Sequence, residues 1–199
     1  MSIARTHATT PGGKRSILTK ILALSGSVRK DSTNSALLRA AIQAAPQGVA
    51  LTLYEGMDAL PIFNPDHTDP LPAGPAGLRM ALRAHEGLLI ACPEYAHGVP
   101  GGLKNLLDWI VGWGELAETP VALWHASVYG ENAKASLAEI LKTMSMHLVP
   151  EASLTLHLRG KKPAEMAPIL ALPETRKTLQ ETLATFAGAI RVRPRPVIV

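Results

Sequence analysis

The most constraining feature of this sequence is the regular alternation of short apolar runs with longer stretches rich in alanine and leucine. The short runs predict strands near residues 20–25, 49–54, 87–92, 119–125 and 148–156. The longer stretches predict helices near residues 33–45, 75–85, 102–113, 131–143 and 173–190. Because apolar strands that alternate with helices form parallel sheets, the pattern predicts an α/β fold in which helices cover both faces of a five-stranded parallel sheet.

The expected strand order is 2-1-3-4-5, in a three-layer sandwich. In this order strands 1 and 3 are neighbours at the point where the winding of the sheet reverses. Ligands of open α/β sheets bind at such a point, at the carboxyl ends of the strands. The loops that follow the first and third strands should therefore face each other across one crevice.

The loop after the first strand has the composition of an anion-binding site. Residues 21–34 read Ile-Leu-Ala-Leu-Ser-Gly-Ser-Val-Arg-Lys-Asp-Ser-Thr-Asn, so an apolar strand leads through a basic, hydroxyl-rich turn into a helix. Free backbone N–H groups at the helix start and the positive end of its dipole favour a bound phosphate. The side chains placed to assist are Ser25, Ser27, Arg29, Ser32 and Asn34. The alternative is an ordinary helix N-cap at Ser32 or Asp31, with Arg29 in solvent.

The glycine content of this loop restricts the phosphate. A nucleoside triphosphate loop needs a Lys-Ser or Lys-Thr ending, and a dinucleotide fingerprint needs three glycines. The turn has one glycine, Gly26, and no such ending. A single terminal phosphate held by several side chains remains, which suits a mononucleotide such as FMN.

The loop after the third strand is suited to a flat ligand. The apolar run Leu88–Cys92 leads into a segment rich in proline and glycine, with one aromatic ring and one imidazole. Such a loop presents rigid backbone groups to the edge of a ring system. The candidate residues are Pro93, Glu94, Tyr95, Ala96, His97 and Gly98. The alternative is a plain connection in which Tyr95 covers the core and His97 faces water.

At these two loops the sequence resembles the NADPH-dependent FMN reductase family of the flavodoxin-like superfamily, which includes quinone, azo-dye and chromate reductases. The resemblance covers most of residues 20–160. Gly26-Ser27-Val28-Arg29 with Ser32 and Asn34 is similar to the family's phosphate motif. Its isoalloxazine-binding signature is similar to Pro93-Glu94-Tyr95 through Gly98, then Pro100-Gly101, Leu103-Lys104-Asn105 and Asp108-Trp109. The resemblance implies a flavodoxin-like domain that binds FMN, takes electrons from NADPH or NADH, and forms a homodimer or homotetramer.

The sequence departs from the family pattern at two places. Many members carry asparagine where this chain has Ala96, so a side-chain contact to the flavin is either missing or supplied by His97. The loop after the fourth strand reads Ser127-Val128-Tyr129-Gly130, where the family often has a serine and a glycine-rich turn. Ser127 and Gly130 are the candidate flavin contacts in this loop.

The resemblance implies an NAD(P)H-dependent oxidoreductase that works by a ping-pong cycle. The expected acceptor is a quinone, an azo compound, a metal oxyanion or free flavin. Because the flavin itself carries the electrons, the protein supplies placement and charge stabilisation, and no catalytic acid or base is assigned. Two alternatives are a flavin-binding carrier or interaction protein without NADPH turnover, and a protein of this fold that holds another phosphate.

Composition agrees with one domain in a reducing compartment. The chain has 199 residues, of which 47% are hydrophobic, enough for one covered sheet. The single cysteine, Cys92, ends an apolar strand and is expected to be a buried thiol, which favours a cytoplasmic location. The seven histidines lack metal-ligand spacing, so no metal is expected. No apolar run approaches the roughly 20 residues that span a bilayer.

The positive charge is concentrated at the two ends of the chain. We expect a flexible basic leader over residues 1–19, the reductase domain over 20–190 and a basic, proline-containing tail over 191–199. Residues 1–20 and 191–199 together hold seven lysines and arginines and no acid, which exceeds the formal net charge of +4. Without a recognition module, this charge gives little support to nucleic-acid binding.

Two further segments allow a structural or an interfacial reading. Trp109 and Trp113 are four residues apart on one helical face, which fits either core packing or a dimer interface. Residues 57–75 are rich in proline, aspartate and glycine, with a turn expected at Asn64-Pro65-Asp66. This segment either connects the second strand to the second helix or also reaches the flavin of a neighbouring subunit.

Overall fold

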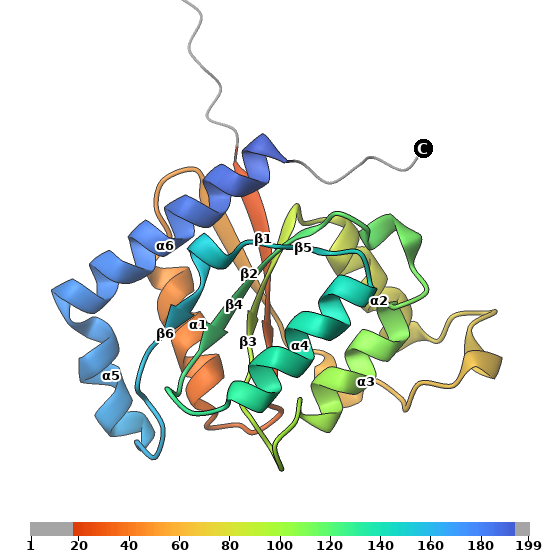
Figure 1. Cartoon of the computed structure of the whole chain (residues 1–199), viewed down its shortest axis with the longest axis horizontal. Helices are drawn as coiled ribbons and strands as arrows, with labels where there is room; N and C mark the ends of the chain where they lie inside the picture. The colour runs from red at the N-terminus through yellow and green to blue at the C-terminus, as the bar shows by residue number, and fades with distance from the viewer. Residues whose placement is uncertain (1–17, 194–199) are drawn as a thin grey trace, which may run out of the picture.

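A computed structural model describes residues 18–193 and confirms the predicted parallel sheet and its order. The strands run β2–β1–β3–β4–β5, with a short sixth strand that also pairs with β4 (Figure 1). All pairings are parallel. The strands are β1 (Thr19–Ser25), β2 (Val49–Tyr54), β3 (Gly87–Ala91), β4 (Pro120–His125), β5 (His147–Leu148) and β6 (Leu154–Thr155).

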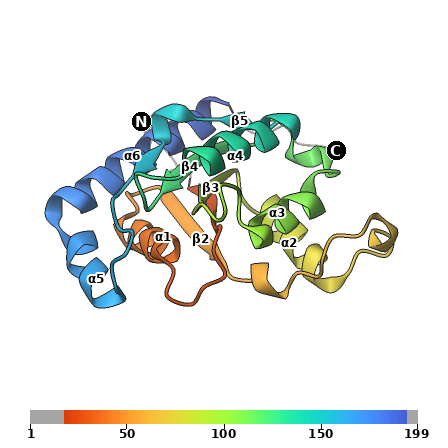
Figure 2. The ribbon, with the colours of Figure 1, turned by 60° about the horizontal axis from the view of Figure 1, so that its bottom comes forward.

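Helices cover both faces of the sheet, as the alternation of elements predicts (Figure 2). The helices α1, α5 and α6 lie on one side, and α2, α3 and α4 lie on the other. Their bounds are α1 (Thr33–Ala44), α2 (Ala73–Arg83), α3 (Gly101–Ile110), α4 (Glu131–Thr143), α5 (Pro163–Ala171) and α6 (Pro173–Val192). Short 3-10 turns occupy Met57–Ala59, Pro65–His67, Gly114–Leu116 and Pro150–Ala152.

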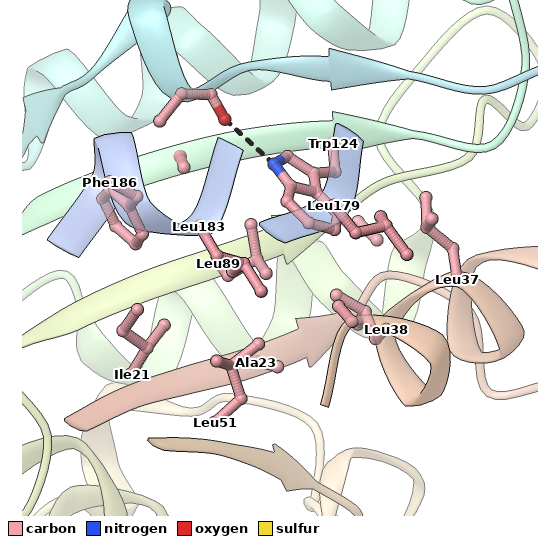
Figure 3. Close-up of a cluster of buried hydrophobic side chains, with 14 of the residues drawn as sticks. Ile21, Ala23, Leu37, Leu38, Leu51, Leu89, Trp124, Leu179, Leu183 and Phe186 are labelled. Carbon is pink, nitrogen blue, oxygen red and sulfur yellow. Dashed lines mark hydrogen bonds between the residues drawn. The ribbon is translucent and has the colours of Figure 1, made fainter. Parts of the chain in front are cut away.

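Each central strand is apolar on both sides because both faces of the sheet are covered. Ile21 and Ala23 of β1 point into the core under α1 and α6, whereas Leu22 and Leu24 point into the core under α2, α3 and α4. In the first core, Trp124 lies beside Leu179 and Leu37, and its indole N–H donates to the Ala152 carbonyl at 2.9 Å (Figure 3). The two cores hold the carboxyl ends of β1, β3 and β4 in fixed register.

The structure corrects two expectations for the last third of the chain. The single strand expected over 148–156 is two short strands, β5 and β6, separated by the 3-10 turn Pro150–Ala152. Pro150 has no backbone N–H to donate to a ladder, so the chain turns there and rejoins β4 further along. Helix α5 was not predicted, because Pro168 lies inside it and breaks the helical pattern.

The structure settles the reading of Trp109 and defines the long segment before α2. Trp109 is buried, donates its indole N–H to the Pro61 carbonyl at 2.7 Å and packs edge-on against Phe63. Asn105 on the same helix binds both the Pro61 carbonyl and the Phe63 N–H. Trp109 is therefore a core residue that, with Asn105, ties residues 61–63 to α3. The expected turn at Asn64 is confirmed, since its side chain caps the 3-10 turn Pro65–His67.

The predicted leader and tail fall mostly on residues 1–17 and 194–199, which lie outside the described residues. Within the described residues, Thr19 begins β1 and Val192 ends α6. Arg191 donates to the Thr19 hydroxyl and the Gly48 carbonyl, so it fixes the end of α6 to the start of the sheet. Within residues 18–193 no helix is both long enough and apolar enough to cross a membrane.

A carboxylate shared by two arginines joins α2 to the segment after α3. Arg79 and Arg83 each donate two hydrogen bonds of 2.7–2.8 Å to the Glu115 carboxylate. These bonds lower the pKa of Glu115 to about 2. The guanidinium of Arg79 also lies 5.3 Å from the centre of the Trp113 ring.

We expect Glu115→Gln to lower the free energy of unfolding at pH 7 by about 1 to 2 kcal/mol. This is less than the free energy equivalent to the whole pKa shift, because solvent screens the charge of Arg83. The folded-state pKa lies below the unfolded one, so this stability is present above the unfolded value and is lost as pH falls towards about 2. Urea unfolding at pH 7 and at low pH measures the effect. Glu131→Gln, which removes only an exposed pair with Lys134, is the control, and an equal effect in both variants would refute the assignment.

Candidate functional site

The carboxyl ends of β1, β3 and β4 open into one cleft of about 820 Å³. This is the crevice expected between the loops after the first and third strands, and the loop after β4 joins it. The predicted residues that line it are Ser27, Arg29, Ser32, Asn34, Pro93, Glu94, Tyr95, Ser127 and Gly130. Its volume lies within the range of small-molecule and cofactor sites.

Gly26 lets the first two loops approach each other closely. A Cβ atom at Gly26 would lie 3.0 Å from Pro93 Cδ, 3.1 Å from Leu103 Cδ2 and 3.2 Å from Cys92 Cα. The Gly26 N–H also donates to the Ala91 carbonyl at 2.8 Å, which extends the β1–β3 pairing into the loop. A side chain at this position would push the two walls of the cleft apart.

The start of α1 is built by serine hydroxyl groups. Ser32 is the N-cap, and its hydroxyl accepts from the N–H groups of Asn34 and Ser35. The Ser35 hydroxyl donates to Ser25 Oγ at 2.8 Å, and Ser25 in turn donates to the Ser27 carbonyl. Ser25 therefore shapes the loop from behind and does not line the cleft. The N-cap reading of Ser32 is correct, and it coexists with a cleft-facing loop.

Two side chains, Arg29 in this loop and Asn34 in the first turn of α1, can still form hydrogen bonds to a ligand. Asn34 is buried, and its Oδ1 atom has no hydrogen-bond partner among the described residues. Because buried polar atoms are nearly always paired, this amide oxygen is suited to accept from a donor that enters the cleft, such as a ligand hydroxyl group. Arg29 is exposed and lines the same wall, with its guanidinium held by the Asp31 carbonyl at 2.9 Å. Together they fit a ligand with an anionic end and adjacent hydroxyl groups, as FMN has.

Tyr95 connects the two loops directly. Its hydroxyl lies 3.1 Å from the Ser27 hydroxyl, while 53% of the residue is exposed. Ser27 Oγ also accepts from the Arg29 N–H. Tyr95 therefore lies across the mouth of the cleft. The alternative of a plain connection required Tyr95 to cover the core, which it does not do.

Ala96 and His97 form the tip of a tight hairpin beside the cleft. Tyr95 and Gly98 exchange two backbone hydrogen bonds of 2.9 and 3.1 Å, and the two residues between them have φ of +48° and +60°. This is the geometry of a two-residue turn that favours asparagine and glycine. Ala96, His97 and Gly98 are not among the residues that line the cleft, and His97 is exposed.

We expect Ala96→Gly to raise the free energy of unfolding by up to about 1 kcal/mol, because glycine adopts positive φ without strain. Thermal or urea unfolding measures the change. Ala135→Gly, at an exposed position within α4, is the matched control and should lower stability by about 1 kcal/mol. Destabilisation by both substitutions would show that the turn at Ala96 carries no strain.

Glu94 serves as a helix cap supplied from a distant loop. Its Oε2 atom accepts from the Ala133 N–H at the start of α4 at 2.9 Å. Gly130, the N-cap residue of α4, has φ +115°, and a Cβ there would lie 3.3 Å from Glu94 Cβ. The carboxylate is thus committed to joining the β3 and β4 loops. Ser127 stabilises the same loop by accepting the Tyr129 N–H.

Burial shifts the pKa of two titratable groups near the cleft, Cys92 and His125, towards the neutral form. Burial, with a contribution from Glu94, raises the pKa of the Cys92 thiol to about 12. Cys92 is buried, as expected. Burial also lowers the pKa of His125, whose Nδ1 lies 3.2 Å from the Cys92 carbonyl. Among residues 18–193 no group of three His, Cys, Asp or Glu side chains is placed to hold a metal ion.

One wall of the cleft was not anticipated from the sequence. Arg159, Gly160, Lys161 and Lys162, in the loop between β6 and α5, line this wall together with Pro163, the first residue of α5. Because 148–156 was read as a single strand and α5 was missed, this loop had no predicted position. The cluster of three cations around Gly160 was the available signal.

Comparison with known proteins gives a consistent family. The sequence model of the family described as NADPH-dependent FMN reductase matches residues 19–159. The probable NADPH:quinone oxidoreductase 2 of Oryza sativa subsp. japonica is 28% identical over 188 residues, covering 89% of this chain and 92% of that protein. The 2-hydroxy-1,4-benzoquinone reductase of a Burkholderia species is 31% identical, covering 71% of this chain and 68% of that protein.

A solved structure supports the fold. The flavoenzyme NAD(P)H:(acceptor) oxidoreductase FerB of Paracoccus denitrificans superposes with a TM-score of 0.75. Its sequence is 22% identical, and the match covers 88% of this chain and 99% of that one. The flavodoxin-like architecture expected from the sequence is therefore confirmed.

Proposed function

The chain belongs to the NADPH-dependent FMN reductase family, and from this premise we propose that it is an FMN-dependent NAD(P)H oxidoreductase that reduces a quinone-type acceptor. The observation that carries the proposal is the cleft in which Arg29, the cleft-facing serines and the unpaired Asn34 amide meet the Pro93–Tyr95 loop. Relatives named as quinone reductases support the acceptor class. Azo compounds, metal oxyanions and free flavin are the other acceptors to compare.

The loop at the start of α1 is proposed to hold the FMN phosphate. Ser27, Arg29, Ser32 and the side-chain NH2 group of Asn34 would donate to it, assisted by the positive end of the helix dipole. Pro93, Glu94 and Tyr95, with Ser127 and Gly130, would border the ring system. FMN, when bound, supplies the redox chemistry by accepting a hydride and passing electrons on. The protein's own residues orient the reactants and fix the walls of the cleft.

A ping-pong cycle agrees with a single cleft. The loops after β1, β3 and β4 open into the same space, so the nicotinamide and the acceptor would use one face in turn. Tyr95, exposed at the mouth and bonded to Ser27, is placed to narrow that entrance. No side chain is assigned to proton transfer.

Assembly into a homodimer or homotetramer stays a prediction, as does a cytoplasmic location. Exposed apolar side chains support the predicted assembly. Ile62 and Met80 are 82% and 73% exposed, and Val111 at the end of α3 is 51% exposed. The single buried cysteine agrees with a reducing compartment.

The visible absorbance spectrum of the FMN-reconstituted protein tests the function. Anaerobic NADPH should bleach the flavin band within the mixing time, and a quinone should restore it. A bound flavin that dithionite bleaches but NADPH does not would refute the reductase and favour an electron carrier. A protein that stays colourless with added FMN would refute the cofactor.

A further inference from the structure

Three cations on the loop between β6 and α5 line the cleft without an ion pair to their side chains from any described residue, although the Lys162 backbone N–H donates to Glu165 Oε2 at 2.6 Å. Arg159, Lys161 and Lys162 line it, and none of them forms an ion pair with a residue in 18–193. Elsewhere in the described chain, arginines such as Arg79 and Arg83 are neutralised by an acid. Uncompensated positive charge in a cleft attracts an anionic ligand.

The loop that carries these cations is anchored at its base. Leu158 is fully buried, and its N–H donates to the Ala126 carbonyl at 3.1 Å. The Lys161 N–H donates to the Leu158 carbonyl, which closes a four-residue turn whose third residue, Gly160, has φ +79°. That position of a turn favours glycine. The cations therefore project from a defined turn.

An aromatic surface lies next to the same loop. The guanidinium of Arg159 lies 5.4 Å from the centre of the Tyr129 ring, and His157 packs edge-on against this ring with the centroids 6.5 Å apart. Tyr129 is 63% exposed and lines the cleft. An exposed tyrosine beside an arginine offers a stacking surface for a purine and donors for a phosphate attached to it.

The FMN phosphate is already provided with Arg29, the serine hydroxyls and the start of α1. Besides the phosphate of FMN, the site would then receive a second phosphate monoester from NADPH. This is the 2′-phosphate on the ribose of its adenosine, a group that NADH lacks. We propose that Arg159, Lys161 and Lys162 bind the 2′-phosphate of NADPH, with Tyr129 beside the adenine, and so select NADPH over NADH. This inference rests on the proposed function and names the determinant of its nucleotide preference.

Steady-state kinetics of the FMN-loaded full chain form the first test. The kcat/KM for NADPH should exceed that for NADH by about tenfold or more, and Arg159→Ala with Lys161→Ala and Lys162→Ala should lower this ratio at least about tenfold. Arg159→Ala alone, at an exposed position, should lower it partly. Lys142→Ala, at the far end of α4, should leave the ratio unchanged. An unchanged ratio in the triple variant, or a wild type without preference, overturns the proposal.

Direct binding separates this inference from the proposed activity. Calorimetry should show that adenosine 2′,5′-bisphosphate binds more tightly than 5′-AMP to the FMN-loaded protein, and that the triple variant loses the difference. If neither NADPH nor NADH reduces FMN, but the wild type prefers the bisphosphate and the triple variant does not, then the proposed reductase activity is wrong and the phosphate site is supported. A Kd for FMN raised more than about tenfold in the triple variant would assign the cations to the FMN phosphate and overturn the proposal.

Discussion

Replacement of Arg29 by alanine is expected to raise the Kd for FMN by about 100-fold, because charge-assisted hydrogen bonds to a phosphate contribute about 1.5 to 3 kcal/mol. Arg29 is the cation among the α1-side residues that line the cleft. Its side chain is exposed, so the free energy of unfolding of the FMN-free protein should change by less than about 0.5 kcal/mol. Fluorescence titration of the apoprotein with FMN measures the Kd.

Two substitutions make this result specific. Lys30→Ala removes the adjacent cation, which does not line the cleft, and should leave the Kd nearly unchanged. Arg29→Lys keeps the charge but loses the planar guanidinium, so its Kd should fall between those of the wild type and the alanine variant. A change below about threefold for Arg29→Ala would mean that the phosphate binds elsewhere.

The sheet and two walls of the cleft were predictable because their signals are local in the sequence. Apolar strands such as Leu22–Leu24 and Leu88–Ala91 are buried on both faces, and each leads directly into a distinctive loop. The order of the strands then brings the loops together without any knowledge of side-chain contacts. For the same reason Ser27, Arg29, Ser32 and Asn34 were identified by their place at a helix start.

The features of the fold and the cleft that the sequence did not predict depend on contacts between residues far apart in the chain. Glu94 lines the cleft, and its carboxylate also caps α4 through Ala133, 39 residues away, a pairing that the sequence did not predict. Asn105 belongs to the resemblance motif, yet its observed partners are Pro61 and Phe63. The loop that carries Arg159 was hidden because Pro150 divides one apolar stretch into two short strands. No local pattern encodes these pairings.

The close approach at Gly26 shows how these local and distant contacts combine. The β1 loop supplies the proposed phosphate contacts and the β3 loop supplies the proposed ring contacts, so one ligand can reach both only if the loops stay adjacent. The β1–β3 ladder, the Ser27–Tyr95 bond and the missing Cβ of Gly26 together set that spacing. Of these, the missing Cβ is the one that a single substitution tests most directly.

Gly26→Val is therefore expected to weaken FMN binding at least about 100-fold and to lower the free energy of unfolding by about 2 to 3 kcal/mol. The first atom of the new side chain would already lie 3.0 Å from the Pro93 ring and 3.2 Å from the Cys92 backbone, neither of which can rotate away. Leu103, the third neighbour, is fully buried and has no space to retreat. The strain is relieved only if the two loops separate.

The matched control is Gly77→Val in α2, since a Cβ at Gly77 meets no atom within 4 Å and this residue does not line the cleft. This variant should keep its affinity for FMN. Circular dichroism at the titration temperature must show that Gly26→Val is folded, so that the loss of affinity reports loop separation and not unfolding. If the folded variant binds FMN as the wild type does, the two loops do not act on one ligand, and the division of FMN between them is wrong.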